Sequence, residues 1–323
     1  MKKVIYPLAI ALLLPAACIK NYSQKDLEDG HKVEVTVTIR QDAGSRASGT
    51  TYSEESRVNS LQVFAFNGNA LEDYKYVTSS LTATLAATSG EREIWAVVNA
   101  PLLSDVTSLT ELKSKVSYLS DNAPDNLVMV GSAKDGLRDG GVVHIDVKRL
   151  ASRCSIGKIS SAFHHALSNA QVAIDAVYII NATAGISYDL SSFPSSWINE
   201  LGHNDSDHDN ILFDAVTGVT VTNTASYTKE HAFYPYPNPS STHTMLVIEV
   251  TFHENESDIT GTKGYYPIKL PAIERNKTYI IEEVILSRRP GSVPYEPIET
   301  GEASVEISVH DWEIGLNLGT ITI

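Results

Sequence analysis

Lys32-Val-Glu-Val-Thr-Val-Thr-Ile-Arg40 is the stretch around which the rest of the chain is organised. Apolar and polar residues alternate along it, and this period of two predicts a β-strand with one buried and one solvated face. The buried face would consist of Val33, Val35, Val37 and Ile39. Residues 41–50 are small and polar with no apolar anchor, so we expect an exposed loop that a protease can cut. The sequence therefore predicts a core strand that can be severed from its sheet.

Length and composition favour a folded protein of two domains. The chain has 323 residues, of which 42% are hydrophobic and 20% are charged, as expected for globular domains and not for a disordered chain. Its formal net charge of −14 disfavours nucleic acids and anionic lipid surfaces as partners, because both require basic patches.

The N-terminus has the layout of a secretory signal peptide over residues 1–17. Two lysines precede an apolar run, Val4–Leu14, that is too short to span a bilayer. Cys18 then follows two small residues, as in the bacterial lipobox, which predicts acylation of Cys18 and a lipidated tether over residues 18–31. The alternative is an ordinary signal peptide with a chance cysteine. The other cysteine, Cys154, would then have no disulfide partner, and we expect it to be a small core residue.

Many short apolar segments separated by turn signals predict an all-β protein with one or two short helices. We place an N-terminal β-sandwich domain over residues 32–149 and a C-terminal one over residues 150–323. A capping box at Ser108 and helical spacing of leucines predict a helix over 108–119. Residues 182–230 are expected to be loop-rich, with a short helix near Ser195–Leu201. The expected strands are 58–66, 74–77, 81–86, 92–98, 127–130, 142–147, 153–159, 172–181, 245–252, 265–270, 278–286 and 303–309.

No constellation in the sequence indicates catalysis or a cofactor, since phosphate loops, paired Cys-x-x-Cys motifs and nucleophile elbows are missing. Asp205, Asp207 and Asp209 imitate the start of a calcium loop. However, Asn210 occupies the position that requires glycine and Val216 the position of the bidentate glutamate, which favours a solvated acidic loop. Four tyrosines suit either a sugar-binding platform or packing between prolines, and we favour packing. They are Tyr234, Tyr236, Tyr265 and Tyr266.

Taken in order, several motifs resemble those of the fimbrillin family, the type V pilins of Bacteroidales-type bacteria. In the first half they are Arg46-Ala47, Leu61-Gln-Val-Phe-Ala-Phe-Asn-Gly68, Trp95-Ala-Val-Val-Asn-Ala-Pro101, Val128-Met-Val-Gly131 and Arg149-Leu-Ala-Ser-Arg153. In the second half they are Tyr234-Pro-Tyr-Pro-Asn238, Thr244-Met-Leu-Val-Ile-Glu249, Gly264-Tyr-Tyr-Pro-Ile268, Arg275-Asn-Lys-Thr-Tyr279 and the late Trp312.

The resemblance implies two transthyretin-like β-sandwich domains and a structural, non-enzymatic fimbrial subunit. It implies export as an outer-membrane lipoprotein, transfer to the cell surface, and cleavage by an arginine-specific protease between Arg46 and Ala47. Cleavage would release the first strand, and a C-terminal strand of another subunit, within residues 313–323, would fill the groove. The donor residues would be Ile314, Leu316 and Leu318.

Other interpretations remain open. Arg40 and Arg57 are alternative cleavage sites. Within the same class, the chain would be an accessory, tip or anchor subunit, and an anchor would keep its lipid and first strand. From another class, it would be a surface glycan-binding lipoprotein. The expected partners are other copies or related subunits, the processing protease, and ligands on host or bacterial surfaces.

Overall fold

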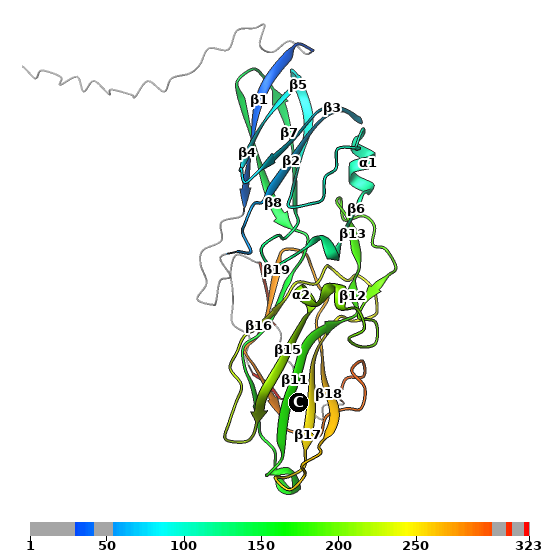
Figure 1. The fold of residues 1–323 in the computed structure, drawn as a ribbon. Coiled ribbons are helices and arrows are strands. Elements are labelled where there is room, and N and C mark those ends of the chain that lie inside the picture. Colours follow the sequence, from blue (N-terminus) through cyan, green and yellow to red (C-terminus); the bar gives the residue numbers. More distant parts are fainter. Residues whose placement is uncertain (1–29, 42–53, 299–307, 312–319, 323) are drawn as a thin grey trace, which may run out of the picture.

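The computed structural model describes residues 30–41, 54–298, 308–311 and 320–322. Strands dominate, and the helices are short. Figure 1 shows an elongated molecule, with one large sheet at one end and several smaller sheets at the other. The predicted all-β class is confirmed. Among the described residues, no helix has the length and apolar character needed to cross a membrane.

The large sheet contains seven strands, all from the first half of the chain. Their order is β3-β2-β5-β7-β8-β1-β4. Their bounds are β1 Lys32–Gln41, β2 Ser60–Asn67, β3 Ala70–Thr78, β4 Thr82–Thr88, β5 Gly90–Val98, β7 Met129–Leu137 and β8 Gly141–Arg149. The first predicted strand, β1, is therefore an interior member of the sheet.

A long connection joins β5 to β7, and its Leu112 and Leu119 belong to the same apolar cluster as Phe64 and Trp95. It contains helix α1 (Leu109–Ser114), strand β6 (Val116–Tyr118) and the 3₁₀ helix η2 (Leu119–Asp121). Ser108 caps α1 as predicted, and its side chain accepts a hydrogen bond from the Glu111 amide. The prediction that the helix reaches residue 119 was wrong, because the backbone turns extended at Lys115 and β6 pairs with another strand.

The second half of the chain forms two four-stranded sheets and one three-stranded sheet. The first contains β15 (Phe213–Val221), β11 (Gln171–Ile180), β17 (Met245–His253) and β18 (Thr262–Lys269), in that order. The second contains β16 (His231–Phe233), β9 (Arg153–Ile156), β19 (Lys277–Ile281) and β21 (Ser308–Asp311). The third contains β10 (Ile159–Ser161), β20 (Glu283–Leu286) and β22 (Thr320–Thr322).

Residues 182–230 contain more structure than the sequence predicted. The expected helix near Ser195–Leu201 was wrong: Trp197–Ile198 form β14, which pairs with β12 (Ala182–Thr183). The nine-residue strand β15 was missed. The short helices of this half are η3 (His165–Leu167), η4 (Ser206–His208) and α2 (Asp209–Leu212).

Two main apolar clusters hold the molecule together. One contains only residues of the seven-stranded sheet, among them the four inward residues of β1. The larger cluster continues from the opposite face of β2 and β5, through Phe64 and Trp95, into the second half of the chain. The strands β2 and β5 are therefore buried on both faces, as the continuous apolar run in β5 predicted.

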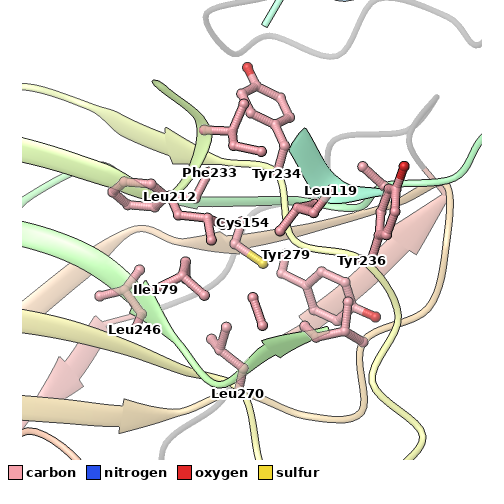
Figure 2. Packing of buried hydrophobic residues seen from close by; sticks show 14 of the residues in the cluster. Leu119, Cys154, Ile179, Leu212, Phe233, Tyr234, Tyr236, Leu246, Leu270 and Tyr279 are labelled. Atoms are coloured by element: carbon pink, nitrogen blue, oxygen red, sulfur yellow. The ribbon is translucent and has the colours of Figure 1, made fainter. Parts of the chain in front are cut away.

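The predicted packing role of the tyrosines is confirmed for Tyr234, Tyr236 and Tyr266, which are buried, and Tyr265 is half-buried. Figure 2 shows Cys154 among Tyr234, Tyr236 and Tyr279, with Leu119 from the first half of the chain beside them. Burial raises the pKa of the Cys154 thiol to about 12, which leaves it protonated and unreactive.

The two halves of the chain share a ladder and a polar network. Strand β6 pairs antiparallel with β13 (Gly185–Ser187). The buried hydroxyl of Tyr236 lies 2.8 Å from Ser117 Oγ and accepts a hydrogen bond of 2.7 Å from Asn122 Nδ2. These buried polar groups are hydrogen-bond partners for one another, and their contact orients the second half of the chain against the first.

Candidate functional site

The site with the clearest functional implication is the position of β1 within the seven-stranded sheet. One edge of β1 pairs antiparallel with β4, from Lys32↔Thr88 to Thr38↔Thr82. The other edge pairs parallel with β8, from Val35↔Gly141 to Gln41↔Val147. We call the space that β1 occupies between β4 and β8 the β1 slot. Strand β1 lies between β4 and β8, and these two strands do not pair with each other in the described residues.

The inward face of β1 is fully buried, as its alternation predicted. Val33, Val35, Val37 and Ile39 are between 0% and 3% exposed and belong to the core of this sheet. Further hydrogen bonds hold the ends of β1. The amide of Ile39 donates to the Leu81 carbonyl at 2.9 Å, and the amide of Gly140 donates to the Glu34 carbonyl at 3.0 Å. The strand is thus bound along both edges and one face.

An open cavity of about 420 Å³ lies at the C-terminal end of β1. The residues that line it include Ile39, Gln41, Ser56, Val58 and Leu81. The side-chain amide of Gln41 donates to the Ser56 carbonyl at 2.7 Å across this space. Residues at the end of β1 and residues shortly after position 54 therefore line one hollow.

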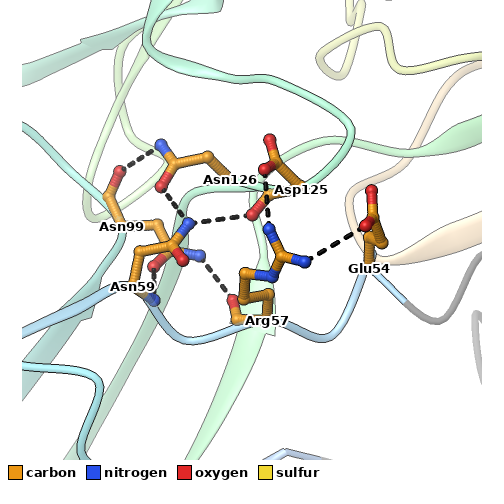
Figure 3. Close-up of polar contacts among 6 residues, drawn as sticks. All are labelled: Glu54, Arg57, Asn59, Asn99, Asp125 and Asn126. Atoms are coloured by element: carbon orange, nitrogen blue, oxygen red, sulfur yellow. Dashed lines mark hydrogen bonds and ion pairs between the residues drawn. The ribbon is translucent and has the colours of Figure 1, made fainter.

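The segment that re-enters is held by a dense set of polar contacts. Figure 3 shows Arg57 between Glu54 and Asp125, at 3.1 Å and 2.9 Å. Asn99 has a positive φ of 59°, and its side chain accepts from the Asn59 amide and donates to the Arg57 carbonyl, both at 2.8 Å. These bonds fix the chain immediately before β2.

Glu55 is the buried anchor of the same segment, with 7% of its surface exposed. Its carboxylate lies 3.2 Å from Arg153 Nε and accepts a 2.8 Å hydrogen bond from the Tyr234 hydroxyl. Arg149 donates two hydrogen bonds of 3.2 Å to the Glu55 carbonyl. Both arginines of the Arg149-Leu-Ala-Ser-Arg153 motif therefore hold the residues that follow the predicted cleavage loop.

No motif around Glu55 marks it as a site residue in the sequence. The signal that could have found it is the pair of arginines in a motif rich in apolar neighbours, because a buried guanidinium needs a carboxylate partner. The position of that carboxylate in the chain is a tertiary fact that the sequence pattern does not contain.

The three candidate cleavage arginines occupy different settings. Arg40 is exposed but lies within β1, opposite Asp146 of β8, so its backbone is part of a ladder. Arg57 is held by its two ion pairs. Arg46 and Ala47 lie outside the described residues, as does Cys18. A protease needs an extended and accessible backbone, and the positions of Arg40 and Arg57 make both poor substrates.

The predicted donor residues Ile314, Leu316 and Leu318 also lie outside the described residues. The short strands on either side of them pair within this chain. Strand β21 pairs antiparallel with β19, and β22 pairs parallel with β20. The donor assignment therefore stays a prediction.

The acidic loop predicted to be solvated carries histidine contacts. His203 Nε2 lies 2.8 Å from Asp209, His208 Nδ1 lies 3.3 Å from Asp205, and the Asp205 side chain caps η4. Within the ranges that the structure describes, no group of three or more His, Cys, Asp or Glu side chains is placed to hold a metal ion.

Comparisons with known proteins agree with the resemblance to the fimbrillins that the sequence motifs indicated. Residues 32–146 match the model of the family described as Major fimbrial subunit protein (FimA). No curated protein sequence matches this chain. Several solved structures share its fold.

A candidate cell adhesion protein of Bacteroides eggerthii is 19% identical with a TM-score of 0.66, covering 92% of this chain and 99% of its own. A fimbrilin of Porphyromonas gingivalis is 14% identical with a TM-score of 0.60, covering 90% of this chain and 96% of its own. The tip fimbrial protein Mfa3 of P. gingivalis, truncated at its C-terminus, is 13% identical with a TM-score of 0.50, covering 87% and 100%. The resemblance to the fimbrillins is thereby confirmed at the level of family match and fold.

Proposed function

We propose, from the likeness of this chain to the fimbrillins, that it is a structural fimbrial subunit that polymerises through the β1 slot. In this proposal it is exported with its signal peptide, acylated on Cys18 and anchored in the outer membrane. An arginine-specific protease then cuts after Arg46 at the cell surface. The piece before the cut carries β1, and a C-terminal strand of another copy then displaces it.

The observation that carries the proposal is the pairing of β1 on both edges together with the burial of its inward face. Burying four such apolar side chains is worth roughly 6–12 kcal/mol, at about 1.5–3 kcal/mol each. This is comparable to the whole stability of a typical domain, which is about 5–15 kcal/mol. A subunit without β1 would therefore bind a matching strand strongly.

The arrangement of the chain also supports proposed domains over residues 32–149 and 150–323. The seven-stranded sheet is formed entirely before residue 150, and its slot is separate from the sheets that carry β21 and β22. A strand donated from the end of one copy into the slot of the next is a head-to-tail contact. Such contacts do not close on themselves, so repeated donation gives a filament.

The anchored segment before β2 suits this role. Because Glu55 and Arg57 fix the chain from residue 54 onward, a cut at Arg46 would separate β1 from a body that keeps its remaining contacts. Ile314, Leu316 and Leu318 are the proposed donor residues. For donation, β22 would have to leave its three-residue pairing with β20.

The test is mass analysis of the N-terminus of surface-extracted protein, for the wild type and for Arg46→Ala, with Arg57→Ala as the matched control. We expect assembled copies to begin at Ala47, Arg46→Ala to remain unassembled, and Arg57→Ala to behave like the wild type. Lipid-bearing Cys18 on every assembled copy would contradict the proposal and indicate an anchor subunit. Unchanged assembly of Arg46→Ala would also contradict it.

A further inference from the structure

Strand β4 has an unusual dependence on β1. It is the last strand of the seven-stranded sheet, and among the described residues β1 is its only ladder partner. If β1 left, no backbone ladder would hold β4, and the slot would lose one wall. Something other than β1 must therefore fix β4 if the slot is to survive.

The outer edge of β4 is identified by its hydrogen bonds to β1. Ser89 and Ile39 mark the two ends of this pairing, where the Ser89 amide donates to His31 and the Ile39 amide donates to Leu81. In an antiparallel ladder, bonded and non-bonded positions alternate. The amides of Ala86 and Thr88 therefore point away from β1, toward the exposed edge of the sheet.

Two carboxylates from β3 bond these outer amides. Asp73 Oδ2 accepts from the Ala86 amide at 2.7 Å, and Glu72 Oε2 accepts from the Thr88 amide at 3.0 Å. Glu72 Oε1 also accepts from the Thr88 hydroxyl at 2.6 Å. Hydrogen bonds with a charged acceptor are about twice as strong as neutral ones. We call this set of contacts the carboxylate seam.

A β-bulge in β3 makes the seam geometrically feasible. Asp73 lies opposite Ala65 and Leu71 lies opposite Phe66, so Glu72 is an extra residue with no opposite on β2. Consecutive residues of a regular strand point to opposite faces, and a bulge redirects its side chains. Here the bulge lets two consecutive carboxylates reach the same neighbouring strand.

Arg92 of β5 fixes the Glu72 carboxylate. Its Nε lies 3.0 Å from Glu72 Oε2, its guanidinium also contacts the Thr88 hydroxyl, and only 7% of Arg92 is exposed. Burial raises the pKa of Glu72, but hydrogen bonds from Thr88 and Arg92 outweigh it and leave that pKa below its ordinary value. Glu72 is thus held as an anion in the seam.

We propose that the carboxylate seam keeps β4 in place as a wall of the slot when β1 leaves, and closes the outer edge of β4 to other strands. An incoming strand can then pair only on the slot side of β4. Blocking an exposed sheet edge with charged side chains is a common way to prevent unwanted pairing. The inference rests on the proposed function only for the identity of the strand that enters.

The first test uses the uncut protein and amide hydrogen exchange, so it is independent of cleavage and assembly. We expect Asp73→Ala to accelerate exchange at Ala86, and Glu72→Ala at Thr88, by about tenfold or more. Asp73→Asn keeps an oxygen acceptor and should retain most of the protection. Asp146→Ala removes an exposed carboxylate from β8, the other wall, and should change neither amide. Wild-type rates at Ala86 in Asp73→Ala would overturn the seam, even if Glu72→Ala fails to fold.

The second test uses protein cut between residues 41 and 54 and freed of its N-terminal piece. A labelled synthetic peptide of residues 31–41 serves as the probe. We expect Asp73→Ala to bind it at least about tenfold more weakly than the wild type. Glu256→Ala, which removes an exposed carboxylate outside the seven-stranded sheet, should bind it equally. Equal binding by Asp73→Ala would refute the role of the seam as a wall. Failure of the cut wild type to bind the peptide would instead refute the proposed function, with the exchange result unaffected.

Discussion

Replacing Val37 by alanine is expected to loosen β1 without altering the outward face of the strand. Val37 is 0% exposed and lies in the core of the seven-stranded sheet. The substitution removes two methylene equivalents, worth about 0.8 kcal/mol each, and leaves a cavity. The combined cost is about 2–3 kcal/mol. Because about 1.4 kcal/mol corresponds to a factor of ten, β1 is expected to be retained about 30–150-fold less tightly.

The assay follows the N-terminal piece after cleavage. Protein labelled near its N-terminus is cut with an arginine-specific protease, diluted, and separated by size at increasing times. The wild-type piece is expected to remain bound, since cutting the chain breaks no contact of β1 with β4 or β8. The Val37→Ala piece is expected to dissociate sooner, and Thr38→Ala, whose side chain is outside the core cluster, should resemble the wild type. Equal dissociation of the Val37→Ala and wild-type pieces would show that the inward face does not hold the strand.

Three further outcomes are expected. Glu55→Ala removes the carboxylate that pairs with Arg153 and accepts from the Tyr234 hydroxyl, while Arg153 keeps Glu230 at 2.8 Å. It should lower the free energy of unfolding by about 1–3 kcal/mol in urea titrations, whereas the exposed Glu54→Ala should cost below about 1 kcal/mol. Because the pKa of Glu72 is lowered in the folded state, its carboxylate stabilises the fold above the ordinary pKa of 4.5, and this stabilisation is lost as pH falls through the folded pKa. Glu72→Gln should therefore lose less melting temperature than the wild type on acidification. An identical loss in both proteins would contradict the stabilising role of the Glu72 carboxylate. The Cys154 thiol should resist thiol reagents at pH 8 in the folded protein and react once urea unfolds the chain, which peptide mapping would show. Rapid labelling of Cys154 in the folded protein would contradict its burial.

Elements with a strong local period could be predicted from the sequence. The alternation in β1 gave both its strand and its buried face, because one residue of slippage would expose all four apolar side chains. The apolar run in β5 indicated burial on both faces, and the structure supplies a separate apolar cluster for each face. In these segments local pattern and tertiary packing require the same conformation.

Elements whose local signal conflicts with their tertiary setting could not be predicted. Strand β15 carries Asp214 and Gly218 within an irregular burial pattern, because in the part of the chain that the structure describes it is an edge strand paired with β11 alone in its sheet. Residues 116–119 fit a helical spacing, yet Val116–Tyr118 pair with a strand from far along the chain. The carboxylate seam could not be predicted either, since the bulge that directs the Glu72 side chain toward β4 depends on the pairing of β3 with β2.

The double pairing of β1 has a mechanical consequence. A strand bonded along both edges and pulled along its own axis loads all of its backbone hydrogen bonds together, so none can fail first. The same strand lifted from one end is peeled away bond by bond under a much smaller force. Whatever segment occupies this position is therefore gripped firmly against axial tension, yet it can be exchanged stepwise by a competitor that starts at one end.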